Sequence, residues 1–579
     1  MADAETYPPE IELDVDSQPL EFDDDGLGIP KTEAEEDLLA GLATPGFTTI
    51  SEDRDVKDPK AWGEDQTVRA ALLHHICLNP ELYKLDPEGI AIGGTRIAGI
   101  LNFENATLPP LVIQFSRFTA APNLILAKTA GLNFNGSFLA GINADSLTIR
   151  GFLFLRGATV HGETRLLGAN IDGNLECDNA SFDNQNANAF SADGLTVTGG
   201  LFMRHSTVHG ACRLLGAHIG GDLDCDKTTF DHKKNEAAFH ADSMTVKSNL
   251  FLRHTTINGA CRLIGANIGG NLECDNASFN HDNRYAFIAE RLVVGNRFIW
   301  TNFQTVPNGH VTLRHARVGD FYDDASGWPE PGKLHLDGFE YENLGYYAPA
   351  NSLCKWLQLQ PQTYPHSGEP AYWPQPYEQL AKTHRNAGHE RDARIVAMAK
   401  QDARRDYLRR MANYDGDPRY GRRAWLWFLD WSAGYGYAPW RALVLLAFFW
   451  AIGTVVFEVG HVGGHVLPAK DRAYMQACYR HYDAENCGPH WRNHSTQPSY
   501  LSARLEPGVR YGLPHDYVTF FAPAYAFDVL IPILDLGQED HWAPKTGWVR
   551  AYMWLHIIAG WVFTTIAVAG FTGLIKKDD

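Results

Sequence analysis

The segment GATVHGETRLLGANIDGNLECDNASF, residues 157–182, decides the fold because the chain repeats it twice more. HSTVHGACRLLGAHIGGDLDCDKTTF covers residues 205–230 and HTTINGACRLIGANIGGNLECDNASF covers residues 254–279, so the period is 48 and then 49 residues. Repetition at a fixed period is typical of solenoid proteins, in which each repeat buries its apolar face only against its neighbours.

A shorter unit of eleven residues, L-x-L-x-G-A-x-V-x-G-x, lies inside this period. Leu153, Thr164 and Leu175 begin three successive units, and an insertion of four residues at 186–189 precedes the fourth, which begins at Phe190. Alternating apolar positions separated by Gly or Asn indicate two short strands in each unit, joined by tight turns.

Two units make a coil of about 22 residues with four short faces. This pattern resembles the pentapeptide-repeat and related quadrilateral β-helices, which implies that small and large apolar side chains stack inward. Stacking buries one continuous column and pairs the backbone of each coil with its neighbours. The predicted fold is therefore mainly β, a right-handed quadrilateral β-helix over residues 90–325, with a capping helix within residues 61–89.

Five cysteines fall on inward positions of the repeat, at which leucine also occurs. We expect each to be a small buried hydrophobe rather than a metal ligand or a redox centre. No C-x-x-C spacing occurs in the chain. The five are Cys177, Cys212, Cys225, Cys261 and Cys274.

Opposite charges occupy the same position of the repeat one coil apart. We expect ion pairs between adjacent coils with a structural role, and a groove that recognises a charged ligand is the alternative. The insertions DNQNAN, DHKKNEA and NHDNRY fall on one side of the stack, where solenoids commonly bind partners. The expected pairs are Arg156 with Asp178, Arg204 with Asp226, and Arg253 with Asp275.

Two segments flank the repeats. Residues 1–60 hold 18 Asp and Glu but 4 Lys and Arg, so we expect an acidic and largely disordered leader that serves as a solubilising or partner-docking tail. After an irregular linker at 326–371, residues 372–412 predict a tetratricopeptide-like helical hairpin packed on the end of the β-helix. A peptide-binding module is the alternative for this hairpin.

The C-terminal part predicts a membrane anchor. Residues 413–441 are basic and aromatic, which indicates an interfacial membrane belt rather than nucleic-acid binding. Residues 442–460 and 551–575 are apolar enough to span a bilayer. Arginines before the first span and Lys576 and Lys577 after the second place both termini in the cytoplasm. We therefore expect a multi-pass protein of a bacterial inner membrane, with residues 461–550 external.

The external loop carries two further candidate features. Cys478 and Cys487 are expected to form a disulfide bond, and a metal site with nearby histidines is the alternative. Residues 517–536 are apolar but interrupted, which indicates an interfacial or re-entrant helix. If the tail is a pore, four residues would line a cation path. They are Asp528, Asp535, Gln538 and Glu539.

The motifs YEQLAKTHRNAGHERDAR, GYGYAPWRA, LIPILDLGQEDHWAP and GWVFTTIAVAGFTGLI resemble those of large bacterial repeat proteins with a two-span membrane tail. The resemblance covers about residues 60–577. Members of that family are often labelled membrane-associated oxidoreductases. No dinucleotide, flavin or haem motif in this chain supports that label, and we expect no catalytic, cofactor-binding or metal-binding residue.

Two functional classes follow from these features. The first is a non-enzymatic scaffold or sensor that presents a cytoplasmic β-helix to a protein partner at the bilayer. The alternative is a ligand-gated pore built from the two spans, with a homo-oligomeric assembly left open. A membrane-associated oxidoreductase comes third.

Overall fold

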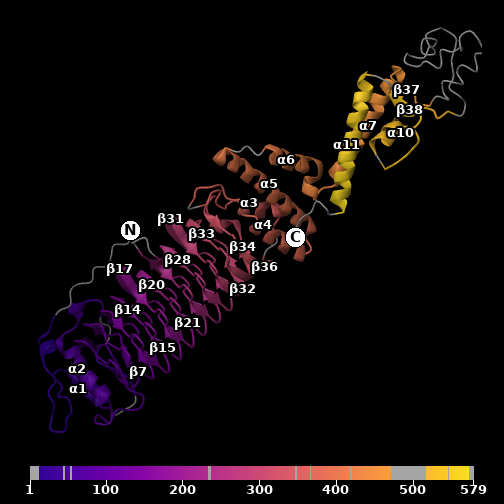
Figure 1. Ribbon diagram of the computed structural model, residues 1–579. Coiled ribbons are helices and arrows are strands. Elements are labelled where there is room, and N and C mark those ends of the chain that lie inside the picture. Colours follow the sequence, from indigo (N-terminus) through magenta and orange to yellow (C-terminus); the bar gives the residue numbers. More distant parts are fainter. Residues whose placement is uncertain are drawn as a thin grey trace, which may run out of the picture. The chain divides into compact units, whose positions relative to one another are not determined.

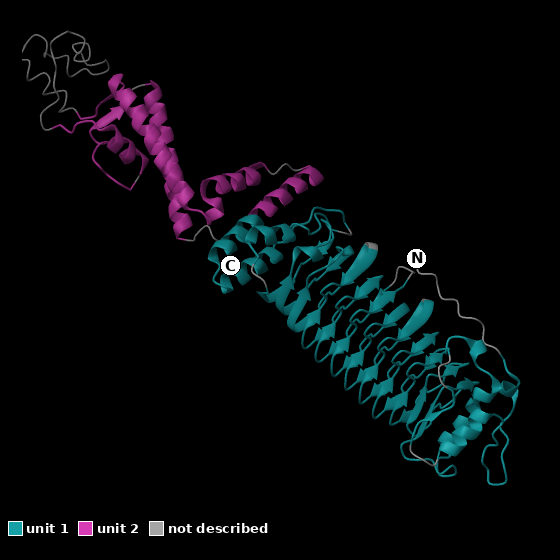
Figure 2. Ribbon diagram, turned by 180° about the vertical axis from the view of Figure 1, so that it is seen from behind, with its two compact units in different colours: residues 1–400 teal, residues 401–579 magenta. Residues whose placement is uncertain are grey.

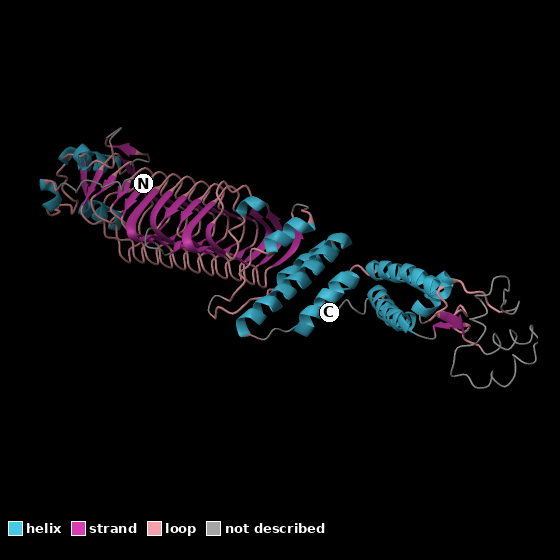
Figure 3. Ribbon diagram, turned by 90° about the horizontal axis from the view of Figure 1, so that it is seen from above, coloured by secondary structure: helices cyan, strands magenta, loops and turns pink. Residues whose placement is uncertain are grey.

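The computed structural model describes residues 12–42, 46–51, 55–232, 237–345, 348–364, 367–416, 420–470, 517–531, 533–544 and 547–572. The chain divides into two compact units, Met1–Lys400 and Gln401–Asp579 (Figure 2). Unit 1 is a stack of β-coils closed by helices at both ends, and unit 2 is mainly helical (Figures 1 and 3).

Each full coil of unit 1 has four faces, and in several coils one short strand lies on each face. In one coil these strands are β11 (Thr148–Ile149), β12 (Leu153–Phe154), β13 (Thr159–His161) and β14 (Thr164–Arg165). Each pairs in parallel with its equivalent in the next coil, as β12 does through Leu153 and Leu175. The predicted four-faced β-helix is therefore confirmed.

The strands form four ladders along the stack. The first contains β7 (Lys128–Thr129), β11, β15 (Asn170–Ile171), β18 (Thr196–Val197), β21 (His218–Ile219), β25 (Thr245–Val246) and β29 (Asn267–Ile268). The second contains β3 (Ile90–Gly93), β5 (Leu111–Gln114), β8 (Leu132–Asn133), β12, β16 (Leu175–Glu176), β19 (Leu201–Phe202), β22 (Leu223–Asp224), β26 (Leu250–Phe251) and β30 (Leu272–Glu273). Both continue into β32 (Val293–Trp300), β34 (Arg317–Asp323) and β36 (Glu340–Leu344).

The other two faces share several longer strands. The third ladder contains β2 (Thr67–Arg69), β4 (Arg96–Ala98), β6 (Arg117–Phe118), β9 (Phe138–Leu139), β13, β17 (Ser181–Ser191), β20 (Thr207–Arg213), β23 (Thr229–Asp231), β27 (Thr256–Asn258) and β31 (Ser278–Ile288). The fourth contains β10 (Ile142–Asn143), β14, β17, β20, β24 (Ala237–His240), β28 (Ala260–Arg262), β31, β33 (Asn308–Thr312) and β35 (Leu334–His335).

The three insertions occupy one corner of the coil, between the third and fourth faces. Strand β17 shifts register between Asp183 and Asn188, and β31 shifts between Asn280 and Tyr285. A further shift occurs in β24 after Ala237. The flanking strands keep their partners because the extra residues leave the ladder locally, as in a β-bulge.

Apolar side chains fill the interior of the stack. Phe182 packs on Phe190 at a ring-centroid distance of 5.2 Å, and the pairs at the equivalent positions lie 5.1 Å apart. All five cysteines of the repeat are fully buried among these side chains, as predicted. The equivalent pairs are Phe230 with Phe239 and Phe279 with Phe287.

The N-terminal end is covered by the acidic leader and a helix. Helix α2 (Ala70–Leu78) follows β2, so the solenoid begins before the predicted residue 90. Helix α1 (Glu33–Gly41) supplies Glu35, which accepts hydrogen bonds from the Arg69 side chain at 2.8 and 2.9 Å. Asp16 pairs with the buried Arg96 at 2.6 Å. Residues 12–42 therefore differ from the predicted disordered leader, because buried arginines of the first coils need carboxylate partners.

The C-terminal end of the stack extends to β36, beyond the predicted residue 325. Helices α3 (Ala350–Leu357) and α4 (Gln375–Asn386) follow, and α5 (Glu390–Asp415) forms the second arm of the hairpin. The Gln379 amide donates to the carbonyl of Tyr341 at 2.6 Å, and Gln375 bonds to Gly338 and Phe339. These amides satisfy backbone groups that the last coil leaves open.

Unit 2 contains α6 (Tyr420–Ala433), α7 (Trp440–Val462), α10 (Ala522–Leu530) and α11 (Gly547–Phe571). A short antiparallel ribbon joins β37 (Val466–Pro468) to β38 (Trp542–Pro544). Within the described residues, α7 and α11 are long and apolar enough to cross a membrane. They correspond to the two predicted spans.

Candidate functional site

The outer surface of unit 2 is apolar along both long helices. Phe448 and Val455 on α7, and Ile558 and Trp561 on α11, are all more than half exposed. Many exposed large apolar side chains on both helices indicate contact with a non-aqueous phase. These two helices therefore indicate membrane association.

The short helix α10 packs against both span-length helices. The indole of Trp450 on α7 donates to the carbonyl of Pro523 at 2.9 Å, and His556 on α11 lies 3.0 Å from the carbonyl of Ala526. A Cβ atom on Gly560 would overlap the carbonyl oxygen of Leu530. Small residues thus allow the three helices to approach closely, as is common in membrane proteins.

The C-terminal end of α10 reaches the middle of the spans. Leu530 belongs to one buried cluster with Leu446, Ala559 and Phe563. Gly560, which contacts Leu530, follows Gly547 by 13 residues, or about 20 Å along a helix of about 37 Å. Helix α10 therefore ends beside the midpoints of α7 and α11.

Asp528 holds the segment that returns from this depth. Its carboxylate accepts backbone N–H groups from Leu536 at 2.7 Å, Gln538 at 2.9 Å and Glu539 at 3.0 Å. Asp528 is 4% exposed, so it does not line a path as predicted. A buried carboxylate is stable only when it is hydrogen-bonded. The three backbone N–H groups provide these bonds and hold the Asp528 carboxylate between α10 and the return segment.

Of the other three residues predicted to line a pore, one is buried and two are exposed. Gln538 is also buried, because its amide bonds to Thr519 and Phe521 of the entering chain. Asp535 and Glu539 are exposed. The Asp535 carboxylate accepts the N–H of Gly537 at 2.8 Å. The structure therefore leaves Asp535 and Glu539 as the exposed acids of the group.

The return segment is non-helical and largely uncovered. Ile533, Leu534 and Leu536 are 79%, 47% and 51% exposed. Among the hydrogen bonds formed by described residues, none reaches the carbonyl oxygens of residues 533–536. In the hydrocarbon core an open carbonyl is costly, so non-helical backbone at that depth is covered by protein or lines water.

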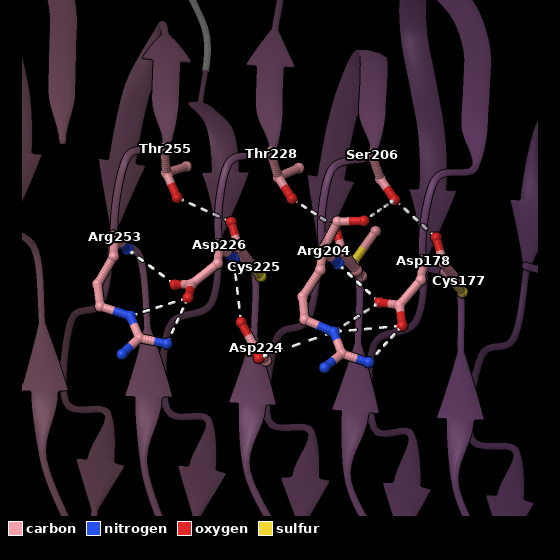
Figure 4. Close-up of polar contacts among 11 residues, drawn as sticks. Cys177, Asp178, Arg204, Ser206, Asp224, Cys225, Asp226, Thr228, Arg253 and Thr255 are labelled. Atoms are coloured by element: carbon pink, nitrogen blue, oxygen red, sulfur yellow. Dashed lines mark hydrogen bonds and ion pairs between the residues drawn. The ribbon is translucent and has the colours of Figure 1, made fainter. Parts of the chain in front are cut away.

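The solenoid carries a second candidate surface, a row of charges on its outer side. Asp178 accepts the backbone N–H of Arg204 at 2.9 Å and pairs with its guanidinium at 2.5 Å. Asp226 pairs with Arg253 in the same way (Figure 4). Arg156 pairs with Glu176.

These contacts correct the predicted pairing of Arg156 with Asp178, Arg204 with Asp226 and Arg253 with Asp275. Arg204 and Arg253 each bind the acid of the preceding coil. The reason is the direction of the backbone, since the N–H of Arg204 points toward the preceding coil and its neighbour His205 donates to the following one. An acid on the preceding coil therefore satisfies both the N–H and the guanidinium.

Aromatic rings lie beside the same arginines. Arg156, Arg204 and Arg253 stand 4.6, 5.2 and 4.4 Å from the centroids of the phenylalanine rings two residues earlier. Those rings alternate along the second ladder with Glu176, Asp224 and Glu273. Five acids thus contact three arginines, which makes this row of side chains net negative.

A further set of ion pairs between adjacent coils was not predicted, because the repeated acids stand out in the sequence but their arginine partners do not. Arg165 pairs with Asp145 at 2.7 Å, and Arg213 with Asp193 at 2.6 Å. Arg262 and Asp242 repeat the contact at 2.6 Å. The carboxylates recur at the long period, and so do the arginines that follow them by 20 residues. That shared period is the signal that could have identified the pairs.

The described cysteines do not form a reactive site. Burial raises the pKa of Cys77 to about 12 and that of Cys354 to about 11, and it raises the pKa of the repeat cysteines further. A thiol that stays protonated is a poor nucleophile. The predicted Cys478–Cys487 pair lies outside the described residues. Across the described ranges, no group of three or more His, Cys, Asp or Glu has the geometry of a metal site.

Comparison with known proteins adds a partial similarity. No family model matches the chain. The chain is similar to alkane 1-monooxygenase 1 of Pseudomonas aeruginosa, with 28% identity over 163 residues, which are 25% of this chain and 41% of that protein. The chain thus spans less than half the length of this relative.

Fold and site together define a β-helix protein with two apolar, span-length helices near its C-terminus. The short helix α10 packs against both of those helices.

Proposed function

We propose that this chain is one subunit of a homo-oligomeric cation pore, formed by the membrane tail and controlled by a cytoplasmic β-helix. The observation that carries the proposal is helix α10, which ends beside the midpoints of α7 and α11 and is followed by a non-helical segment with open carbonyls. A tail that only anchors the protein in the membrane would need the two spans but not α10 and the segment after it.

The open backbone at 533–536 supports an assembly of several copies. In lipid each unsatisfied carbonyl costs several kcal/mol. Copies arranged around a common axis would cover the outer flank of the segment and turn its carbonyls and Asp535 toward water. Carbonyl oxygens and carboxylates attract cations and repel anions, so such a path conducts cations.

The β-helix is the candidate sensor of this pore. The proposal puts it in the cytoplasm, because the basic residues next to the spans favour that side by the positive-inside rule. Its acid-rich row around Arg204 and Arg253 offers a surface for a basic ligand or protein partner. A partner bound there would act on the tail by stabilising one arrangement of the subunits.

A non-conducting scaffold or sensor anchored at the membrane is the second candidate function. The observation that favours it is the apolar character of the exposed return segment, in which Ile533, Leu534 and Leu536 surround the single acid Asp535. In this case those side chains would face lipid and the β-helix alone would carry the function.

Ion flux from liposomes that contain the full-length protein separates the two candidates. We expect potassium flux from the wild type, a clear decrease for Asp535→Ala, and no change for Glu81→Gln, an exposed acid of unit 1. If the wild type gives no flux, either alone or with a cytoplasmic extract of the cells that produce the protein, the pore proposal is contradicted and the scaffold function is favoured.

A further inference from the structure

Helix α6 packs one side against the C-terminal half of α11. Phe428 and Ala433 contribute to a cluster with Ile566 and Ala567, and the ring of Trp431 lies 6.2 Å from that of Phe563. Phe563 precedes the end of α11 at Phe571 by 8 residues, or about 12 Å of helix. The C-terminal half of α6 therefore lies beside the C-terminal third of α11.

The other sides of α6 expose large aromatic side chains. Trp425, Trp427 and Trp431 are 57%, 61% and 48% exposed, and the rings of Trp427 and Trp431 stack at 6.4 Å. Tryptophan is enriched where a membrane meets water, since its ring is apolar and its N–H still finds a polar partner. This aromatic surface thus fits the boundary between headgroups and acyl chains.

Two arginines in the first turn of α6 lack a carboxylate partner within the part of the chain that the structure describes. Arg422 is exposed and Arg423 half-buried, and no ion pair is formed by either one. The only acid of the helix, Asp430, is already bound by Arg405 at 3.0 Å. Guanidinium groups bind phosphate oxygens strongly, often through two parallel hydrogen bonds.

We propose that α6 is an interfacial helix that binds anionic phospholipids, with Arg422 and Arg423 on the lipid phosphates and the tryptophans among the upper acyl chains. The occupant is a lipid because the exposed tryptophans lie on a helix that packs against α11, and α11 itself exposes large apolar side chains such as Trp561 and Val568. The proposal holds for a pore and for a scaffold, since it concerns neither the return segment nor the β-helix.

The test is native mass spectrometry of the full-length protein in detergent, titrated with phosphatidylglycerol or phosphatidylcholine. We expect tighter binding of phosphatidylglycerol, and a loss of roughly tenfold or more in its affinity for the double variant R422Q/R423Q. The matched control R391Q/R394Q removes two exposed arginines of α5 and should bind within twofold of the wild type. Equal binding by R422Q/R423Q and the wild type would overturn the proposal.

Two further measurements separate lipid binding from a folding defect and from binding of a free anion. R422K/R423K preserves the charge, so it should retain most of the phosphatidylglycerol binding, whereas a loss equal to that of R422Q/R423Q would indicate a folding role and overturn the proposal. Inorganic phosphate at millimolar concentration should not displace the lipid, because it lacks the acyl chains that contact the tryptophans. Displacement by phosphate would show a free-anion site instead of a lipid site.

Discussion

Asp528 on α10 accepts the backbone N–H of Gln538 at 2.9 Å, although ten residues separate them along the chain. The same carboxylate binds Leu536 and Glu539, so one side chain holds the whole return segment against α10. The geometry of the candidate pore therefore depends on a buried acid that does not itself face the ion path.

Replacing Asp528 by Asn should release the return segment. An amide has one acceptor oxygen and cannot receive three N–H groups, so at least one buried donor loses its partner, at about 1–3 kcal/mol. We expect a lower Tm in detergent and loss of ion flux. Asp535→Asn is the control for the Tm alone, because its amide oxygen still accepts the N–H of Gly537 although the substitution removes a charge of the proposed ion path. A wild-type Tm for Asp528→Asn would contradict this role.

Replacing Gly560 by Ala should force α10 away from α11. The new Cβ would overlap the carbonyl oxygen of Leu530, and overpacking of this kind costs about 1–3 kcal/mol. We expect a lower Tm and easier proteolysis of the segment between the spans. Gly421→Ala, which meets open space, should not lower the Tm. Equal stability of the two variants would show that α10 is not tightly packed.

The leader should matter more for stability than the exposed row of charges. Glu35 is fully buried against Arg69, so Glu35→Gln leaves an uncompensated guanidinium and should cost about 3–5 kcal/mol. Arg204 is half exposed, and Arg204→Gln should cost less than about 1 kcal/mol. Urea unfolding of the full chain measures both. Similar losses for the two variants would mean that the leader is not docked.

Acid should weaken the C-terminal coils through His335. Burial, with His310 and Arg314 nearby, lowers the pKa of His335 from 6.5 to about 4, and His310 lies 3.1 Å from its ring nitrogen. The unfolded chain binds the proton first, so this contribution is complete above pH 6.5 and is lost as the pH falls toward 4. We expect a loss of about 2–3 kcal/mol over that window.

The variant His335→Gln should remove this pH dependence, and thermal unfolding of the full chain between pH 7 and pH 4 measures it. His161→Gln is the control, because His161 is half exposed on the outer surface. The same loss of stability in His335→Gln as in the wild type would assign the pH dependence to other groups.

Repetition made the β-helix predictable from the sequence. Side chains at equivalent positions, such as Leu153 and Leu175, must pair once the coil length is known. The direction of the ion pairs was not predictable, because two acids flank Arg204 at similar separations and the N–H direction selects Asp178. The buried leader was missed because composition alone does not show that Glu35 meets Arg69.

The tail was predictable in outline but not in its contacts. Two apolar runs indicated the spans, and prolines and acids in 517–536 indicated a break between them. The sequence did not separate Asp528 and Gln538, which are buried, from Asp535 and Glu539, which are exposed. That distinction depends on which backbone N–H groups the return segment presents, and this is a property of the folded chain.

The most direct test of the pore is chemical modification of the return segment during current recording. Asp535→Cys, in full-length protein lacking Cys478 and Cys487, is reconstituted in a planar bilayer and treated with a charged, thiol-reactive methanethiosulfonate. The proposal predicts a current that falls on addition of the reagent, while Glu81→Cys in the same background keeps its current. A current unchanged by modification of residue 535 would contradict the claim that this segment lines the ion path.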